Sequence, residues 1–150
     1  MDVNTNNRVV VHFLDGRLMK GTTVDFFPER PTFHLVVGDS RQEIRCGELK
    51  AVFFVKDLKG DSRRRDAIGF GVEPPGGGKG KKIAVRFKDG ELLCGHTLAF
   101  SRERSGFFVI PADPASNNLR VFVLSHAVTE VQAGPAAEAM ALRGPKRNAA

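Results

Sequence analysis

The sequence predicts an all-β protein made of two tandem five-stranded small barrels, and three observations support this prediction. First, residues 9–36 align without a gap with residues 83–110, with eleven identical pairs among 28 positions. Second, apolar residues in both copies recur with a period of two, which is typical of half-buried strands. Third, the predicted strands are short and are separated by turns rich in Gly, Asp and Pro. An internal repeat of this kind indicates the architecture before any single motif is interpreted.

The repeat divides the chain into four segments. We expect one barrel at residues 8–56, a basic Gly/Pro-rich linker at 57–82, a second barrel at 83–131 and a disordered tail at 132–150. Units of about 50 residues bury little of their surface and are only marginally stable alone. The two barrels should therefore pack on each other, or the chain should oligomerise.

The first element is a strand at residues 9–14, followed by Asp15-Gly16. This dipeptide predicts a two-residue type I′ hairpin turn, in which both central residues have positive φ. The return strand at residues 17–26 contains Gly21, and a glycine inside a strand indicates a bulge or a bend. The second copy repeats these signals in the sequence IAVRFKDGELLCGHT. A bend at the same place in both copies would close two small barrels.

The later strands follow from the same alternation. Pro28 and Pro31 exclude a central strand for the loop after the bend, since proline lacks the N–H that a strand ladder requires. The expected strands after this loop are residues 32–37, 41–46 and 50–55 in the first copy and residues 106–110, 119–124 and 127–131 in the second.

The placed strands resemble Sm-like and SH3-like small barrels. In each copy the pattern V-x-F-x-D-G-x-L-x-x-G-x-T is similar to the first Sm motif. Sm proteins bind single-stranded RNA through an Asp and Asn pair in that motif and an Arg-Gly in the second motif. Residues 26–35 lack the Asp and Asn spacing, and residues 123–125 lack Arg-Gly. The resemblance therefore implies the fold and not the RNA site.

A closer resemblance covers nearly all of residues 8–131. Segments 21–35, 50–61, 87–97 and 106–123 are similar to a bacterial family of tandem small-barrel proteins of uncharacterised function. Domains of that family stand alone or are appended to two-component and PilZ-type signalling proteins. The resemblance implies a signalling context and supplies no activity.

The formal net charge of +6 raises the question of nucleic-acid binding. Most of the excess positive charge lies in residues 57–82 and 132–150, whereas a nucleic-acid surface is normally basic on the fold itself. The chain has no Trp or Tyr to stack on bases. RNA binding remains an alternative function, and its candidate residues are Arg63, Arg64, Arg65, Lys81 and Lys82.

Composition predicts a cytoplasmic protein without a membrane segment. No apolar run approaches the roughly 18 residues of a membrane span, and the N-terminal residues do not form a secretory signal. Cys46 and Cys94 fall at different positions of the repeat, so we expect both to be reduced thiols.

No motif predicts catalysis, a cofactor or a metal. The nucleophile elbow, the Walker A loop and the HExxH motif are all missing from the sequence. Cys94 and His96 share one strand face, but the first copy has Lys20 and Thr22 at these positions, so the repeat contains no duplicated half-site. We therefore predict that the protein is not an enzyme.

Arg41 and Arg45 match the first half of a PilZ motif for cyclic dinucleotides, in which two arginines clamp phosphates. The downstream Asp/Asn-x-Ser-x-x-Gly is missing. Cyclic-dinucleotide binding is therefore a second alternative function rather than the main prediction.

Protein binding is the function that the sequence favours. Phe27 aligns with Ser101, so the shared core does not require it, and it lies beside Pro28 in an irregular loop. Phe53 and Phe54 are neighbours on one strand, so one of them must face away from its local core. The candidate contacts with a protein partner are Phe27, Pro28, Arg30 and Phe54. We expect a non-catalytic regulatory adaptor that acts through these residues and its sheet edges, and strand addition at an edge would also permit a homodimer.

Overall fold

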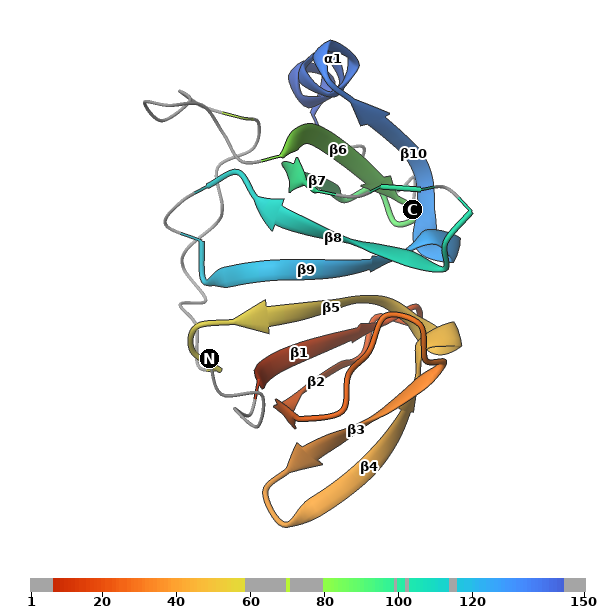
Figure 1. The fold of residues 1–150 in the computed structure, drawn as a ribbon, viewed down its shortest axis with the longest axis vertical. Coiled ribbons are helices and arrows are strands. Elements are labelled where there is room, and N and C mark those ends of the chain that lie inside the picture. Colours follow the sequence, from red (N-terminus) through yellow and green to blue (C-terminus); the bar gives the residue numbers. More distant parts are fainter. Residues whose placement is uncertain are drawn as a thin grey trace.

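The computed structural model describes residues 7–58, 70, 80–98, 100–101, 103–113 and 116–144. Its ten strands form one antiparallel sheet in the order β10-β6-β7-β8-β9-β5-β1-β2-β3-β4, which confirms the all-β class (Figure 1). The strands are β1 (Asn7–Phe13), β2 (Leu18–Thr23), β3 (Thr32–Val37), β4 (Ser40–Arg45), β5 (Leu49–Val55), β6 (Lys81–Phe87), β7 (Leu92–Thr97), β8 (Gly106–Pro111), β9 (Asn118–Leu124) and β10 (Val128–Ala133).

The sheet consists of two halves with the same internal order. The first half (β1–β5) and the second half (β6–β10) each place their fifth strand beside their first and their fourth strand at the far side. A short 3₁₀ helix precedes the fifth strand in both halves, at Cys46–Glu48 and at Ser125–Ala127. The halves are joined where β5 pairs with β9, along the middle of the molecule in Figure 1.

The hairpin after β1 exists, but its predicted turn type is wrong. Phe13 N–H donates to the carbonyl of Arg17 at 2.9 Å, so the loop contains three residues rather than two. Within this loop only Gly16 has a positive φ, of 94°. Every other described residue with a positive φ is also a glycine. A three-residue loop needs a left-handed residue only at its last position, so Asp15 keeps an ordinary conformation and its carboxylate accepts from the backbone N–H of Arg17.

Gly21 and Gly95 lie where the second strand of each half begins to pair with the third strand. A Cβ on Gly21 would lie 2.3 Å from the carbonyl oxygen of Val36, and a Cβ on Gly95 would lie 2.1 Å from that of Ile110. These two positions therefore require glycine because the backbones approach closely. The repeat preserves this approach in both halves.

The two halves share their hydrophobic cores. Phe122 and Leu124 of β9 are buried in the core of the first half. Ala51, Phe53 and Val55 of β5 are buried in the core of the second half. Each half thus completes the core of the other, as expected for units that are only marginally stable alone.

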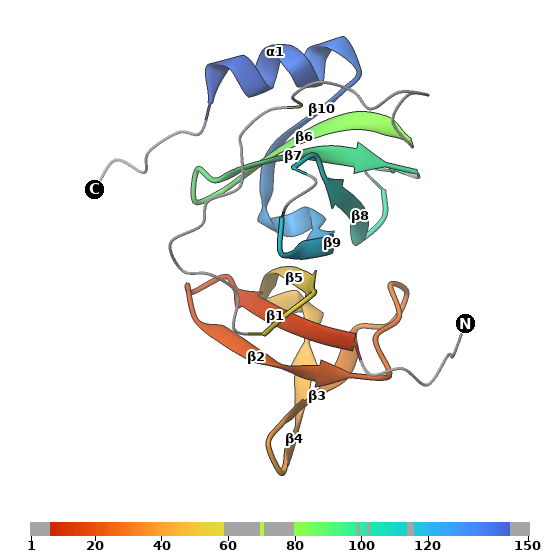
Figure 2. The same ribbon diagram turned by 90° about the vertical axis from the view of Figure 1, so that its left-hand side faces the viewer.

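The prediction of a disordered tail at 132–150 is wrong for the residues that the structure describes. Residues 132 and 133 belong to β10, and α1 (Pro135–Arg143) lies over β6 and β7 (Figure 2). Ala137 and Met140 of this helix are buried in a cluster with Ala84, Leu92 and Cys94. A nine-residue helix is marginal in isolation, and this tertiary packing supplies what its own sequence lacks.

Only part of the predicted linker at 57–82 is described. Residues 59–69 and 71–79 lie outside the described residues, and Lys81 and Lys82 already belong to β6. Phe70 packs against the cluster beneath α1. Among the described helices, none has the length and apolar character that crossing a membrane demands.

Candidate functional site

The register of the two halves shows that β10 occupies the place of β5. Val52 of β5 pairs with Val11 of β1, and Val131 of β10 pairs with Val85 of β6. Val11 and Val85 are equivalent in the repeat, so Val52 and Val131 are equivalent too. The outer edge of β5 carries β9, whereas no described strand pairs with the outer edge of β10.

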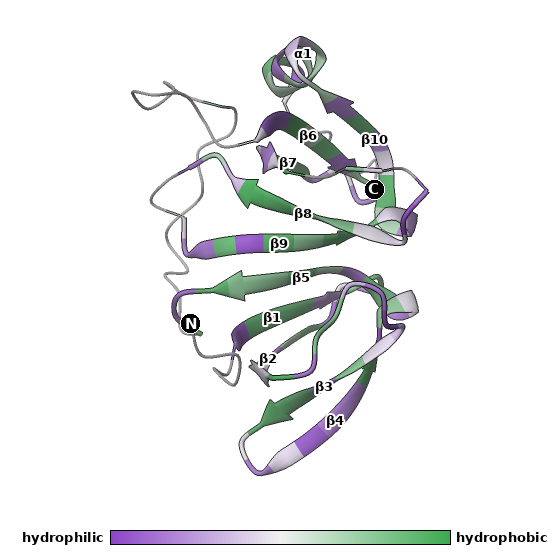
Figure 3. Ribbon diagram, in the orientation of Figure 1, coloured by the Kyte–Doolittle hydropathy of each residue, from purple (hydrophilic) through white to green (hydrophobic). Residues whose placement is uncertain are grey.

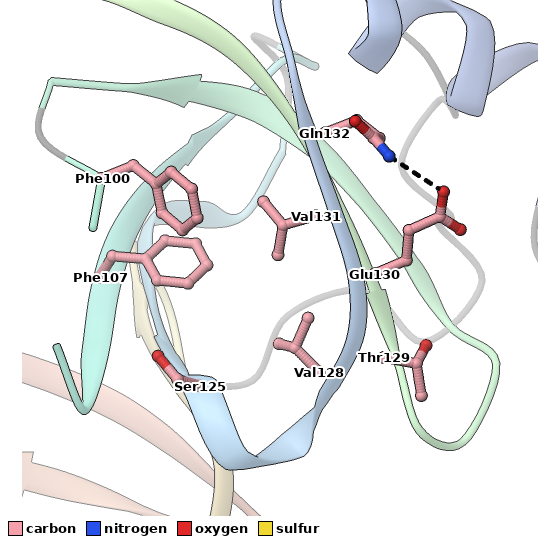
Figure 4. A pocket seen from close by; sticks show the side chains of 8 residues that line it. All are labelled: Phe100, Phe107, Ser125, Val128, Thr129, Glu130, Val131 and Gln132. Atoms are coloured by element: carbon pink, nitrogen blue, oxygen red, sulfur yellow. Dashed lines mark hydrogen bonds between the residues drawn. The ribbon is translucent and has the colours of Figure 1, made fainter. Parts of the chain in front are cut away.

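A groove with a volume of about 340 Å³ opens beside the outer edge of β10. Its apolar wall is formed by Phe100 and Phe107 on one side and by Val128 and Val131 of β10 on the other (Figure 4). The remaining lining residues are polar and are Ser125, Thr129, Glu130 and Gln132. The groove therefore combines an apolar wall and a polar rim at the outermost described strand of the sheet.

The same aromatic pair exists in both halves with different surroundings. The rings of Phe100 and Phe107 meet edge to face at 4.8 Å, and those of their equivalents Phe26 and Phe33 do so at 5.1 Å. In the first half, further rings surround the pair: Phe26 lies 5.4 Å from Phe54, 6.3 Å from Phe108 and 5.1 Å from Phe122. In the second half the equivalent space is the open groove.

The rim of the groove carries an ion-paired carboxylate, that of Glu130. Arg143 donates to the carboxylate of Glu130 at 2.9 Å, and Gln132 donates to it at 3.4 Å. The hydrogen bond from Arg143, followed by that from Gln132, lowers the pKa of Glu130 below its ordinary value, so this carboxylate is ionised at neutral pH. Arg86 lies beneath it, 3% exposed, with Nε 3.7 Å from a Glu130 oxygen.

The hydroxyl groups of the rim donate hydrogen bonds to backbone carbonyls. Ser125 donates to the carbonyl of Arg104 at 2.8 Å, and Thr129 donates to that of Arg86 at 3.2 Å. Both hydroxyl groups therefore donate their protons to backbone carbonyl oxygens.

Phe27, Pro28 and Arg30 form a separate corner of the first half. The Phe27 side chain is 45% exposed, and the Arg30 guanidinium lies 4.5 Å above its ring. The backbone N–H of Arg30 also donates to the carbonyl of Phe27 at 3.0 Å. These contacts present an ordered aromatic and cationic surface, but none of the three residues lines the groove.

Phe54 lies at the contact between the halves. It is 3% exposed, and the Arg120 guanidinium lies 4.5 Å from its ring centre. Its neighbour Phe53 is 8% exposed and belongs to the core of the second half. Both aromatic residues thus serve the internal joint, and Phe54 offers no surface to another protein.

Arg41 and Arg45 are exposed on β4, a largely hydrophilic edge strand in Figure 3. They share one face with Glu43, which lies between them. Arg41 also lies 4.0 Å from the carboxylate of Asp25. The arginine pair is therefore interleaved with negative charge.

Asp25 and His34 form a hydrogen-bonded pair that no sequence motif indicated. His34 Nδ1 lies 2.6 Å from this carboxylate, and the backbone N–H of His34 donates to it at 2.8 Å. Burial raises the pKa of Asp25, but the hydrogen bonds from His34 and Thr23 outweigh it and hold the pKa below its ordinary value. This cluster ties the loop after β2 to β3.

The candidate nucleic-acid residues are only partly placed. Arg63, Arg64 and Arg65 lie outside the described residues. Lys81 is exposed, and Lys82 donates to Glu138 of α1 at 2.8 Å.

The cysteines and histidines do not gather into a ligand set. Within the described ranges, no group of three or more His, Cys, Asp or Glu is placed to hold a metal ion. Cys94 is buried beneath α1, and burial raises the pKa of the Cys46 thiol.

The groove itself was also missed, although the sequence contains a signal for it. The fifth strand of the first half reads LKAVFFV, and its equivalent in the second half reads VTEVQAG. Apolar residues at Ala51 and Phe53 are thus replaced by Glu130 and Gln132. This exchange indicates that β10, unlike β5, does not bury both of its faces in hydrophobic cores.

A family model described as a family of unknown function (DUF6982) matches residues 5–134. This range contains all ten strands and ends just before α1. No curated protein and no solved structure matches the chain.

Proposed function

The chain belongs to DUF6982, a family of unknown function, and we propose that it is a non-catalytic regulatory adaptor that binds a protein partner through the groove along β10. One observation carries this proposal. The space beside Phe26 is filled by rings from the neighbouring half, whereas the equivalent space beside Phe100 is open. A groove with an apolar wall at the surface of a protein is a place where other proteins bind.

The chemistry of the groove favours protein over nucleic acid. Its wall is aromatic and aliphatic, and its rim carries the ionised Glu130. Arg143 at this rim is already ion-paired with Glu130, whereas nucleic-acid surfaces offer basic side chains to the phosphates. The exposed corner at Phe27, Pro28 and Arg30 is the candidate for a second contact with the same partner.

We further propose that each half is a five-stranded Sm-like or SH3-like small barrel. The common strand order and the close backbone approach at Gly21 and Gly95 support this assignment. The resemblance to tandem barrels of bacterial signalling proteins supports the further proposal that the adaptor acts in cytoplasmic signalling.

A comparison of two matched variants tests the proposal. Phe100→Glu introduces a charge into the groove, and Leu98→Glu introduces the same charge nearby in the loop after β7, at a side chain that is 79% exposed. We expect proteins captured from native lysate by the wild type to be retained by Leu98→Glu and lost with Phe100→Glu. Capture should also survive nuclease treatment.

Three other outcomes would assign a different function or surface. Loss of every partner on nuclease treatment would favour the RNA alternative. Loss with Phe27→Glu but not with Phe100→Glu would move the contact to the corner in the first half. Calorimetric heat with cyclic di-GMP that disappears in Arg41→Ala would favour the cyclic-dinucleotide alternative.

A further inference from the structure

We propose that Arg120 forms a binding site for a carboxylate side chain of a partner protein, at the place where the two halves meet. The site goes beyond the proposed function, because none of its residues lines the groove along β10. It consists of the guanidinium of Arg120 on β9 and of two rings that support this guanidinium, Phe54 on β5 and Phe108 on β8.

The guanidinium of Arg120 is held in one orientation by these two rings. Its central carbon lies 4.5 Å from the ring centre of Phe54 and 4.8 Å from that of Phe108. The two ring centres are 5.9 Å apart, and the rings are tilted by 57°. Stacking uses the face of the planar guanidinium, so the N–H donors at its edge remain available to a carboxylate. A donor fixed in this way loses little conformational entropy when a ligand binds.

Arg120 has no acidic partner among the described residues. In the part of the chain that the structure describes, its contacts are the two rings, and no carboxylate lies within ion-pairing distance. Burial lowers the pKa of its guanidinium, and no negative charge of a described residue counteracts this effect. A partly desolvated charge without a counter-ion costs free energy. A carboxylate supplied by another protein would recover it through charge-assisted hydrogen bonds.

The first half shows the same arginine with its acid. The repeat aligns β3 with β8, and the register of each strand with its neighbour places Arg41 of β4 and Arg120 of β9 at equivalent positions. Arg41 lies 4.0 Å from a carboxylate oxygen of Asp25. The residue of the second half that aligns with Asp25 is Ala99. The two halves thus carry the same arginine, but only the first carries an acid at this place in the repeat.

The surface beside Arg120 is apolar. Phe108 is half-buried, and Ile110, two residues further along β8, points to the same face of the strand and is 41% exposed. Phosphate groups are normally recognised by clusters of arginines, whereas one guanidinium can bind both oxygens of a carboxylate. Arginine and aromatic residues are also enriched at the points that contribute most to protein–protein binding. The ligand that fits is therefore an Asp or Glu side chain with an apolar residue beside it.

NMR spectroscopy of the full chain tests the inference, with the Nε–H signals of the arginines as the readout. The probes are the blocked dipeptides acetyl-Glu-Phe-amide and acetyl-Gln-Phe-amide, which differ in the charge of one side chain. The signal of Arg120 is the one that disappears in Arg120→Lys. We expect the Glu dipeptide to shift this signal with a dissociation constant on the order of 1 mM, and the Gln dipeptide to bind at least about fivefold more weakly.

Two matched variants separate a built site from an exposed charge. Arg120→Gln should weaken binding of the Glu dipeptide at least about fivefold, because the guanidinium is lost. Arg41→Gln removes the equivalent arginine, which already lies beside Asp25, and should leave the affinity within about twofold of wild type. If Arg120→Gln did not fold, the shifts of the Arg120 and Arg41 signals in one wild-type spectrum would provide the same comparison.

Four results would overturn the inference. Equal affinities of the Glu and Gln dipeptides, or equal shifts of the Arg120 and Arg41 signals, would show that the rings confer no binding site on Arg120. Tighter binding of inorganic phosphate than of the Glu dipeptide would assign the arginine to a phosphate ligand. A dimer in sedimentation that Arg120→Gln dissociates would make a second copy of this chain the occupant.

This site and the groove along β10 can fail separately. We expect Phe100→Glu to leave the affinity for the Glu dipeptide within about twofold of wild type, because Phe100 is not part of the site. If the dipeptide lost affinity in Phe100→Glu and kept it in Arg120→Gln, it would bind in the groove, and this inference would fall while the proposed function stood. If the dipeptide binds at Arg120 but no captured partner depends on Phe100, the carboxylate site stands and the proposed function falls.

Discussion

The two halves of the molecule have the same strand order and register, yet their fifth strands have opposite surroundings. All residues of β5 except Lys50 are buried, whereas β10 has no fully buried residue. The difference arises because β5 lies between β1 and β9, while β6 is the only described strand that pairs with β10. One strand has become an internal joint, and its equivalent has remained an edge. Repeat positions that disagree therefore indicate which surfaces the fold leaves uncovered.

The largest expected effect tests the feature that the halves share. A Cβ at residue 21 or 95 would meet a backbone carbonyl oxygen at 2.3 or 2.1 Å, and backbone cannot move aside as a side chain can. We expect Gly21→Ala and Gly95→Ala each to lower the free energy of unfolding by about 4 kcal/mol in urea denaturation. Gly47→Ala is the control, because nothing lies within 4 Å of its added Cβ. Similar stabilities of Gly95→Ala and Gly47→Ala would show that the backbones of the second and third strands do not approach closely at this position.

The second prediction tests the difference between the filled and the open aromatic site. Phe26 meets four rings, whereas one face of Phe100 borders the groove. We expect Phe26→Ala to cost about 3 kcal/mol and Phe100→Ala about half as much, because the second substitution creates no closed cavity. Thermal and urea denaturation of the two variants provide the comparison. Equal losses would mean that the groove is closed in solution.

The repeat allowed most of the strands to be predicted, because alternation and turn residues are local signals. The strand at Thr32–Val37 was predicted to the residue. The turn at Asp15-Gly16 was assigned the wrong type, because the dipeptide is compatible with loops of two or three residues. The helix α1 was missed because its stability comes from Ala84, Leu92 and Cys94, which are distant in sequence.

The candidate site was harder to predict than the fold. The pairing of β5 with β9 decides which groove is filled. The sequence of neither strand indicates that it pairs with the other. Phe54 was offered as a partner contact because its strand showed two adjacent aromatics, and the joint between the halves buries both. Phe100 aligns with Phe26 in the repeat, but the alignment does not show that the rings of Phe108 and Phe122 pack beside Phe26 and leave Phe100 next to a groove.

The third prediction uses a position at which the halves carry different charges. Burial, and next the positive charge of Lys50, lower the pKa of His12 from 6.5 to about 4, whereas the equivalent residue of the second half is Arg86. The folded state thus favours neutral His12, so its contribution is fully present above pH 6.5 and is lost as the pH falls toward 4. We expect a loss of about 2 kcal/mol at pH 5 relative to pH 7.5. His12→Leu should lack this slope in denaturation measured between pH 5 and 7.5, and an unchanged slope would contradict the assignment.

The smallest expected effect concerns the ion pairs beside the two equivalent hairpins. In the first half Arg17 pairs with Asp15 at 2.7 Å within one exposed loop. In the second half Lys50 of β5 reaches across the joint, where it pairs with Asp89 at 2.7 Å and lies 4.6 Å from the ring centre of Phe87. The Lys50 side chain is only 12% exposed, so its charge is screened less by solvent than that of Arg17.

We expect Lys50→Met to lower the free energy of unfolding by about 1 kcal/mol and Arg17→Met to leave it unchanged within error. Raising the salt concentration from 0.05 to about 0.5 M should reduce the Lys50 effect only in part, because the pair is partly buried. Denaturation of both variants at the two salt concentrations provides the measurement. If Arg17→Met proved as destabilising as Lys50→Met, the contact between the halves would contribute no more than an exposed loop pair, and the joint would depend on its apolar residues alone.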